Sequence, residues 1–201
     1  MILVVCALLP ELRYFKQRPD VEVFACGVGP VEAALGTARK LALGPYEFVV
    51  NAGIAGAFRP HARIGEAVLV ALETLADLGL EGGAPLELPG GATLIERERA
   101  HAGLLARCAD CGLPTATGIT VSQVTTTAAT AQRLVRRYGA HIESMEGFSV
   151  LRAAAVAQVP ALEVRGISNY VGDRDQSEWD FAAGARATAV ALDAVLDRLT
   201  P

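Results

Sequence analysis

The feature that most constrains the fold is a repeated alternation of short apolar segments with longer segments whose apolar residues fall at helical spacing. Predicted strands cover residues 2–8, 21–26, 48–51, 66–72, 115–124, 141–143 and 161–167. A short predicted helix begins near Pro10, and further predicted helices cover residues 31–43, 96–111, 128–138, 145–158 and 182–199. Residues 73–95 are expected to form a loop or short strands. Strands that alternate with crossover helices predict an α/β fold with a mostly parallel sheet covered on both faces.

We expect a single domain over residues 1–201, because neither a linker nor a repeat interrupts this alternation. A hydrophobic content of 52% is enough for a real core and excludes a disordered chain. A net charge of −4 with no basic run argues against nucleic-acid binding. The first apolar run ends at Pro10, too early for a membrane span, and lacks the basic start of a signal peptide. We therefore expect a cytoplasmic chain without membrane contact.

The motifs that would signal a metal or a cofactor are incomplete. Cys108 and Cys111 have CxxC spacing, but no second pair accompanies them, and a structural zinc needs about four such ligands. The turn at Gly27 and Gly29 lacks the third glycine of a dinucleotide motif, since Glu32 stands in its place. We expect no metal and no cofactor.

Polar residues and glycines directly follow six of the predicted strands. In a parallel sheet these strand ends meet at one edge, so the residues should converge on a single crevice. They are Glu11, Gly27, Gly29, Asn51, Gly53, Gly56, Ser122, Gln123, Ser144, Glu146, Ser168 and Asn169.

Two acids in these turns suit nucleoside chemistry. Glu146 follows a short strand, where a carboxylate can accept hydrogen bonds from the vicinal hydroxyls of a ribose. Glu11 follows Pro10 at a helix start, where the ionised form is favoured and could activate water. Both residues, and Glu143, could instead be ordinary first-turn acids that complement a helix dipole. Trp179 could anchor the core or stack on a flat base.

Five blocks, in this order, resemble the purine nucleosidase/phosphorylase family: residues 7–11, 26–34, 51–56, 144–147 and 164–169. The likeness spans nearly the whole chain and is strongest to the methylthioadenosine/S-adenosylhomocysteine nucleosidase branch. Within that branch the chain is most similar to the futalosine hydrolases of the menaquinone pathway. The resemblance implies a three-layer α/β/α sandwich around a mixed sheet. It also implies a homo-oligomer in which a neighbouring subunit closes part of the site.

The resemblance also implies roles for residues at matching positions. Glu146 would bind the ribose hydroxyls, Met145 would pack against the sugar, and Glu11 would activate the attacking water. The further substrate-binding positions implied are Ser144, Ala55, Gly56, Trp179, Arg165 and Thr126. Among these, Trp179 falls where the family has a base-stacking aromatic, and Arg165 where a residue orders the loop around the leaving group.

The chain departs from the family's pattern at the leaving group. Asn169 stands where the nucleosidases for adenine compounds have an aspartate that acts as an acid. An amide cannot supply a proton, but its NH2 can donate to N7 of a purine while its oxygen accepts a hydrogen bond. That pattern suits a 6-oxopurine such as hypoxanthine, the base of futalosine. Asp173 or Asp175 could still act as the proton source. A second departure is Ser144, where the nucleosidases commonly have glutamate.

The expected activity is N-glycosidic hydrolysis of a small-molecule purine nucleoside, with futalosine as the expected substrate. Alternatives are a methylthioadenosine/S-adenosylhomocysteine nucleosidase, a phosphorolytic enzyme, and a non-catalytic nucleoside-binding protein. Phosphorolysis would need cations around a phosphate, and Arg13, Arg59 and Arg174 are candidates. One of them could instead pair with the carboxylate of futalosine.

Overall fold

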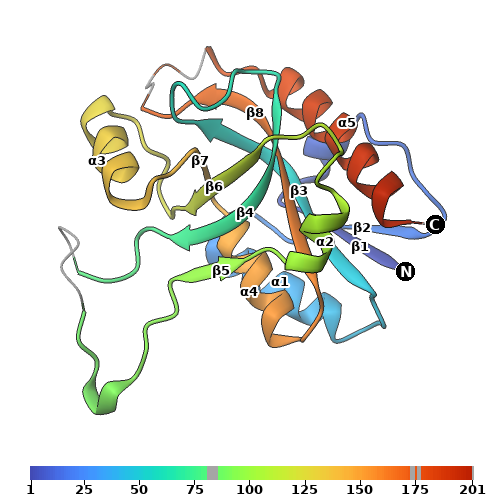
Figure 1. The fold of residues 1–201 in the computed structure, drawn as a ribbon, viewed down its shortest axis with the longest axis horizontal. Helices are drawn as coiled ribbons and strands as arrows, with labels where there is room; N and C mark the ends of the chain where they lie inside the picture. Colours follow the sequence, from blue (N-terminus) through green and yellow to red (C-terminus); the bar gives the residue numbers. More distant parts are fainter. Residues whose placement is uncertain (81–85, 173–174, 176–177, 201) are drawn as a thin grey trace.

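The computed structural model describes residues 1–80, 86–172, 175 and 178–200, in which eight strands form one mixed sheet (Figure 1). The strands are β1 (Ile2–Cys6), β2 (Val21–Ala25), β3 (Phe48–Ala57), β4 (Ala67–Leu75), β5 (Arg97–Arg99), β6 (Thr115–Thr120), β7 (Ile142–Ser144) and β8 (Ala161–Tyr170). The α-helices are α1 (Pro30–Leu41), α2 (Ala102–Arg107), α3 (Ala128–Tyr138), α4 (Gly147–Val156) and α5 (Phe181–Leu199). Two 3-10 helices are η1 (Leu9–Leu12) and η3 (Pro89–Gly91).

The sheet closes on itself through β8. The strand order is β2-β1-β3-β7-β6-β4-β5, and β8 pairs with both β3 and β4. Strands β3, β7, β6, β4 and β8 therefore form a ring. Pairing is parallel except between β3 and β7, β4 and β5, and β4 and β8. The predicted α/β fold with a mixed, mostly parallel sheet is confirmed, but the sheet is partly a closed ring rather than the flat middle layer of a sandwich.

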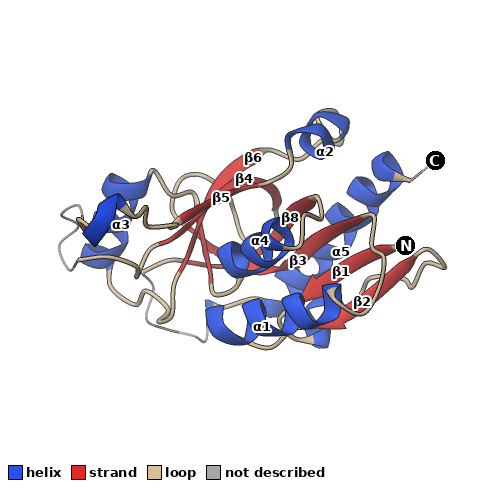
Figure 2. Ribbon diagram, turned by 90° about the horizontal axis from the view of Figure 1, so that it is seen from below, coloured by secondary structure: helices blue, strands red, loops and turns tan. Residues whose placement is uncertain are grey.

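Helices cover both faces of the open half of the sheet, as the alternation predicted (Figure 2). The side chains of β1 alternate between two apolar clusters. Ile2 and Val4 pack with residues of α5 and α2, whereas Leu3 and Val5 pack with residues of α1 and α4. A third cluster takes residues from all five strands of the ring and fills its interior.

Two element boundaries differ from prediction in ways that bear on the site. The predicted strand 48–51 continues to Ala57, and the predicted strand 161–167 continues to Tyr170. Both extensions are rich in glycine, alanine or polar residues, which are typical of turns, yet here they pair with each other along their length. Asn51 and Gly53 therefore lie inside a strand and not in a turn.

The predicted helix 96–111 is wrong over its first half. Residues Arg97–Arg99 form an edge strand paired with β4, and the helix is only Ala102–Arg107. It begins where the side chain of His101 accepts a hydrogen bond from the N–H of Leu104. A charged composition suits an exposed edge strand as well as a helix, which is why the pattern misled.

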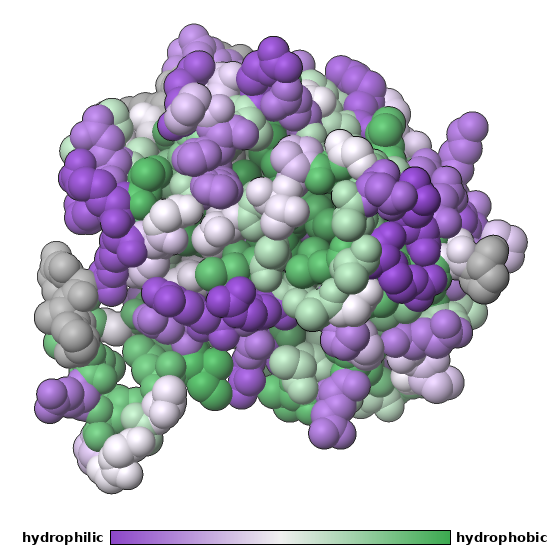
Figure 3. Space-filling model, viewed as in Figure 1, coloured by the Kyte–Doolittle hydropathy of each residue, from purple (hydrophilic) through white to green (hydrophobic). Residues whose placement is uncertain are grey.

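The connection between β4 and β5 extends away from the rest of the molecule (Figure 1). Apolar side chains gather near it in the space-filling view (Figure 3), and Leu80, Leu86 and Ile95 are exposed. Within the described residues, none of the helices has the length and apolar character needed to cross a bilayer.

Candidate active site

A cavity of about 210 Å³ lies where η1 and the ends of β3, β7 and β8 come together. Seven of the predicted site residues line it: Glu11, Ala55, Ser144, Met145, Glu146, Asn169 and Trp179. These residues come from segments spread over most of the chain. Of the twelve residues expected to converge on one crevice, five line this cavity: Glu11, Ser144, Glu146, Ser168 and Asn169.

Glu146 is positioned by the start of α1, not by its own helix. It occupies the N-cap position of α4, but its side chain makes no cap hydrogen bond there. Instead Oε1 accepts a hydrogen bond of 3.0 Å from the N–H of Gly29. Gly29 has a φ of +89°, a conformation that favours glycine. The second oxygen lies 3.7 Å from Nη1 of Arg165, so the carboxylate is held from two sides beside the cavity.

Glu11 is fixed by two backbone donors. Oε2 accepts from the N–H of Leu8 at 2.9 Å, and Oε1 accepts from the N–H of Ile54 at 3.1 Å. Burial raises the pKa of Glu11, while the Arg165 guanidinium and the two backbone donors oppose this rise. The result is a carboxylate of fixed orientation with raised basicity, which suits a base.

Asn169 presents its amide from β8 at the edge of the cavity. Its Oδ1 accepts from the Ser168 hydroxyl at 2.9 Å, and Nδ2 donates to the carbonyl of Tyr170 at 3.3 Å. One hydrogen of the NH2 group is thus committed to the backbone, and a second remains for a ligand. The side chain is 7% exposed.

Trp179 and Phe181 form an aromatic wall of the cavity. Their rings meet edge to face with centroids 5.7 Å apart, and both line the cavity. The indole Nε1 is buried and has no hydrogen-bond partner in the described structure. Met145 lines the cavity as well, so the site offers apolar surface beside its acids.

Two glycines of β3 make room for these groups. A Cβ at Gly53 would lie 2.7 Å from Nη1 of Arg165 and 2.9 Å from Oε1 of Glu11. A Cβ at Gly56 would lie 3.0 Å from Nδ2 of Asn169. Gly56 does not line the cavity itself, and its contribution is to let the amide approach the strand.

Arg165 lies beneath the cavity and does not line it. Its side chain is 1% exposed, and Nε donates to Oε1 of Glu163 at 2.7 Å. Nη1 donates to the carbonyl of Ile54 at 3.3 Å. The neighbouring carboxylates, Glu163 foremost, raise the pKa of Arg165 against the effect of burial, so the guanidinium stays charged. Arg165, which was expected to order the loop around the leaving group, instead forms a buried ion pair with Glu163.

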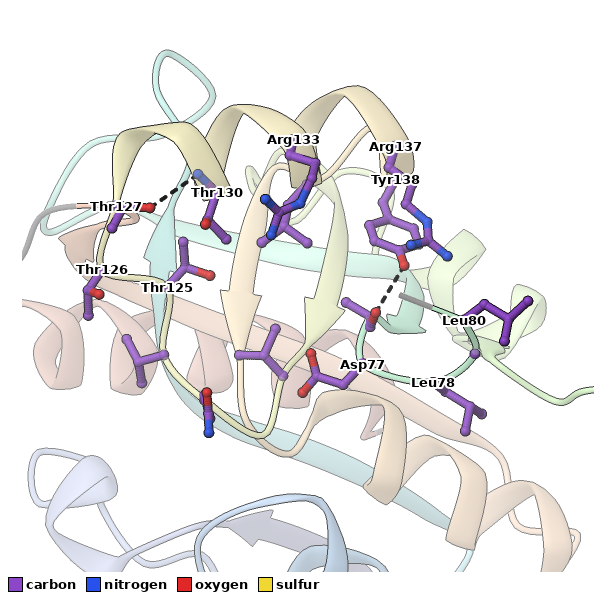
Figure 4. A pocket seen from close by; sticks show the side chains of 16 residues that line it. Asp77, Leu78, Leu80, Thr125, Thr126, Thr127, Thr130, Arg133, Arg137 and Tyr138 are labelled. Atoms are coloured by element: carbon purple, nitrogen blue, oxygen red, sulfur yellow. Dashed lines mark hydrogen bonds between the residues drawn. The ribbon is translucent and has the colours of Figure 1, made fainter. Parts of the chain in front are cut away.

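Thr126 lines a separate groove of about 670 Å³ between α3 and the end of β4 (Figure 4). Arg133 and Arg137 of α3 also line this groove, and the hydroxyl of Tyr138 donates to the carbonyl of Ala76 across it. Val124 lines both the groove and the cavity, so the two adjoin. The groove holds neither Glu11 nor Glu146.

The remaining predicted residues lie elsewhere. Asp175 is exposed and lines none of these pockets, while Asp173 and Arg174 lie outside the described residues. Arg59 stacks on Tyr170 at 3.4 Å, and Arg13 stacks on Tyr14 at 4.8 Å. Among the described residues, none of the cavity's lining side chains is an arginine or a lysine.

Several residues around the site did not stand out in the sequence. Glu143 lines the cavity, and the N–H of Thr125 donates to its Oε1 at 2.9 Å. Burial raises the pKa of Glu143. Phe181 also lines the cavity, and only its spacing from Trp179 could have indicated it; Ser168, which was expected at the crevice, lines it too. No group of three His, Cys, Asp or Glu in the described chain is placed to hold a metal ion.

Comparison with known proteins identifies the family of the chain. The model of the phosphorylase superfamily matches residues 12–200. The chain is 41% identical over 196 residues to the futalosine hydrolase of Streptomyces coelicolor, covering 92% of this chain and 81% of that protein. It is 39% identical over 176 residues to the futalosine hydrolase of Thermus thermophilus, covering 85% of this chain and 78% of that protein.

Solved structures share the fold. The methylthioadenosine/S-adenosylhomocysteine nucleosidase of Colwellia psychrerythraea, solved in complex with adenine, superposes with a TM-score of 0.84 at 19% identity, covering 98% and 95% of the two chains. The futalosine hydrolase of Helicobacter pylori gives a TM-score of 0.83 at 20% identity, covering 98% and 97%. The chain therefore belongs to the phosphorylase superfamily and, within it, to the futalosine hydrolase family.

Proposed function

We propose that this chain hydrolyses the N-glycosidic bond of futalosine, releasing hypoxanthine and dehypoxanthine futalosine. The observation that carries the proposal is that Glu11, Glu146 and Asn169 line a single cavity. The membership of the futalosine hydrolase family supports the choice of substrate. A place in menaquinone biosynthesis follows from that substrate, and we propose a cytoplasmic location because nucleoside metabolites are found there.

The three polar groups suggest a division of labour. Glu146 accepts hydrogen bonds from the 2′ and 3′ hydroxyls of the ribose, and these bonds strengthen as positive charge develops on the sugar. Glu11 takes a proton from the attacking water, whose oxygen bonds to C1′ as the bond to the base breaks. The electron pair of that bond leaves with the base, where the free N–H of Asn169 donates to N7. The hypoxanthine ring tolerates this charge better than adenine does.

The apolar lining suits the rest of the nucleoside. Met145 packs against the sugar, and the Trp179–Phe181 wall offers an aromatic surface for stacking. We propose that Ser144 and Ala55 complete the substrate contacts, since both line the cavity.

Hydrolysis is favoured over phosphorolysis by the cavity's composition. A phosphate would need cationic partners, and none of the described lining residues provides one. A methylthioadenosine/S-adenosylhomocysteine nucleosidase remains the second candidate because structures of that activity share the fold. The amide at Asn169 speaks against it, since adenine leaves best with a proton from an acid.

We further propose that the protein acts as a homo-oligomer. The β4–β5 connection projects from the molecule (Figure 1). Its side chains Leu80, Leu86 and Ile95 are exposed. Apolar side chains on a projecting segment are typical of a surface that another subunit covers. Sedimentation of the purified protein would report the number of subunits.

The decisive assay incubates the purified protein with inosine, adenosine, methylthioadenosine and futalosine, each with and without phosphate. Release of hypoxanthine from futalosine in the absence of phosphate is expected. Release of adenine from methylthioadenosine would instead identify the second candidate. A strict requirement for phosphate would identify a phosphorylase.

A further inference from the structure

A layer of buried charge lies beneath the cavity and has no role in the chemistry proposed above. Glu73 of β4 and Glu163 of β8 are both 0% exposed, and Arg165 of β8 is 1% exposed. Glu146, whose Oε2 lies 3.7 Å from Nη1 of Arg165, is buried beside them. Among the buried residues that the structure describes, Arg165 is the only cation facing these carboxylates. Such an excess of acid cannot be fully ionised away from water.

Glu73 and Glu163 meet beneath the first residue of α4. A Cβ on Gly147 would lie 2.6 Å from Oε1 of Glu73 and 2.6 Å from Oε1 of Glu163. The two oxygens are therefore separated by no more than twice that distance. Oε1 of Glu73 and Oε2 of Glu163 have no hydrogen-bond partner in the described structure. Two carboxylates this close in a dry interior do not both ionise, because the charge on one raises the pKa of the other.

The hydrogen bonds indicate which acid holds the proton. Glu163 is the direct partner of the guanidinium, since Arg165 Nε donates to it at 2.7 Å. Glu73 has only one donor, the hydroxyl of Thr120 at 2.8 Å, which accepts in turn from the N–H of Phe148. Burial raises the pKa of both acids, and Arg165 opposes the rise more directly at Glu163. The proton therefore belongs on Glu73.

Arg165 connects this pair to the two acids of the site. Its Nη1 lies 3.7 Å from Oε2 of Glu146 and shares the space beside Gly53 with Oε1 of Glu11. One guanidinium thus serves Glu163 on one side and two site carboxylates on the other. The more of the Arg165 charge Glu163 neutralises, the less Arg165 lowers the pKa of Glu11.

We propose that Glu73 is a neutral carboxylic acid beside a charged Glu163, and that the charge on Glu163 sets how strongly Arg165 acts on Glu11 and Glu146. Glu73 and Glu163 are then positioning residues, which touch no substrate. The charged groups that act on Glu73 are Glu163, Arg165 and Glu146, and Glu98 of β5 is its register partner. Glu98 pairs with Arg152 of α4 at 2.9 Å. Glu163 is therefore the main acid that acts on Glu73.

The first test is spectroscopic and needs no substrate. The infrared spectrum of the wild-type protein at neutral pH should contain a protonated-carboxyl band that Glu73→Gln removes. Glu98→Gln, at the register partner of Glu73, should keep this band. A spectrum without the band, or one that Glu73→Gln leaves unchanged, would overturn the proposal. The result stands even if futalosine is not the substrate.

The second test is kinetic and rests on the proposed function. Because Gln mimics a neutral acid, Glu73→Gln should leave the acid limb of the kcat/KM profile on futalosine in place. Adding Glu163→Gln to that variant removes one negative charge, so the limb should move to lower pH by on the order of one unit. The inference fails if Glu73→Gln alone moves the limb that far, or if the double variant leaves it unmoved. If the wild-type protein does not hydrolyse futalosine, that result contradicts the proposed function, and the infrared test still decides the protonation of Glu73.

Discussion

At the scale of single residues, the orientation of Glu11 is built into the backbone and does not depend on substrate. Two N–H groups, from Leu8 and Ile54, hold its carboxylate. A base that is already oriented avoids the cost of being ordered during the reaction. Replacing Glu11 by Gln keeps the shape of the side chain and removes its ability to accept a proton, so the two contributions can be tested separately.

Glu11→Gln should lower kcat about 10²–10⁴-fold, because an amide cannot accept the proton of water. KM should change little, since the ribose contacts proposed for Glu146 remain. Steady-state kinetics on futalosine check both values, with Glu32→Gln, an exposed acid of α1, as the matched control. An unchanged kcat would remove Glu11 from the mechanism.

Asn169→Asp should shift the preference of the enzyme toward adenine nucleosides. A carboxyl at this position would face the carbonyl of Tyr170, now 3.3 Å from Nδ2, and repulsion there would favour the protonated acid. That acid could protonate adenine as it leaves. The ratio of kcat/KM for adenosine over futalosine should rise at least about tenfold. A ratio that stays constant would show that the amide does not select the base.

At the scale of elements, β3 carries the glycines on which the site depends. The strand passes between Arg165 and Glu11 at Gly53 and beside Asn169 at Gly56. A side chain at either point would push a functional group away from the cavity. The glycine content that resembles a turn in the sequence is therefore a requirement of close packing within a strand.

Gly53→Ala should destabilise the fold by about 1–3 kcal/mol, because its Cβ would overlap Arg165 and Glu11, neither of which can move freely. Urea unfolding measures the free energy of unfolding, and the rate of futalosine hydrolysis by this variant should also fall. Gly103→Ala, at an exposed position of α2, is the control. Its Cβ would lie 3.1 Å from the exposed ring of His101, which can shift, so this change should cost less than Gly53→Ala. Equal stability of the two variants would contradict the close approach.

The sequence was sufficient for the α/β class, for α3 and α5, and for the convergence of Glu11, Glu146 and Asn169. It was insufficient where the outcome depends on which strands are neighbours. Pairing between β3 and β8 turns the Gly-Ala stretch into strand, and pairing of β8 with β4 closes the ring. The approach of Glu73 to Glu163 depends on the same pairing, and residue 73 begins the segment expected to form a loop or short strands.

At the scale of the whole molecule, buried acids give stability an unusual dependence on pH. The pKa values of Glu11, Glu73, Glu143 and Glu163 are all raised, with burial as the largest cause. Such groups stay protonated in the folded chain at pH values where they ionise in the unfolded chain. The folded state then binds more protons, and the free energy of unfolding falls as pH rises.

We therefore expect the protein to lose stability as pH rises from about 4.5, the ordinary pKa of a glutamate, into the neutral range. Each carboxyl that is protonated only in the folded chain contributes about 1.4 kcal/mol per pH unit. Urea unfolding at several pH values measures the slope, and Glu73→Gln should make it shallower. Stability that rises steadily with pH across this range would contradict the assignment. The lowered pKa values of Glu22 and Glu66 act below this window, where stability falls with acid.

The closed ring of strands also limits how copies of the chain can aggregate. Edge strands with unpaired backbone groups recruit further strands and seed fibrils. In the described chain only β2 and β5 have a single neighbour. β5 carries the charged run Arg97–Arg99, and Glu22 of β2 is engaged by Lys40 and Tyr46. Each molecule thus offers few exposed strand edges from which misassembled β-structure could grow in a concentrated solution.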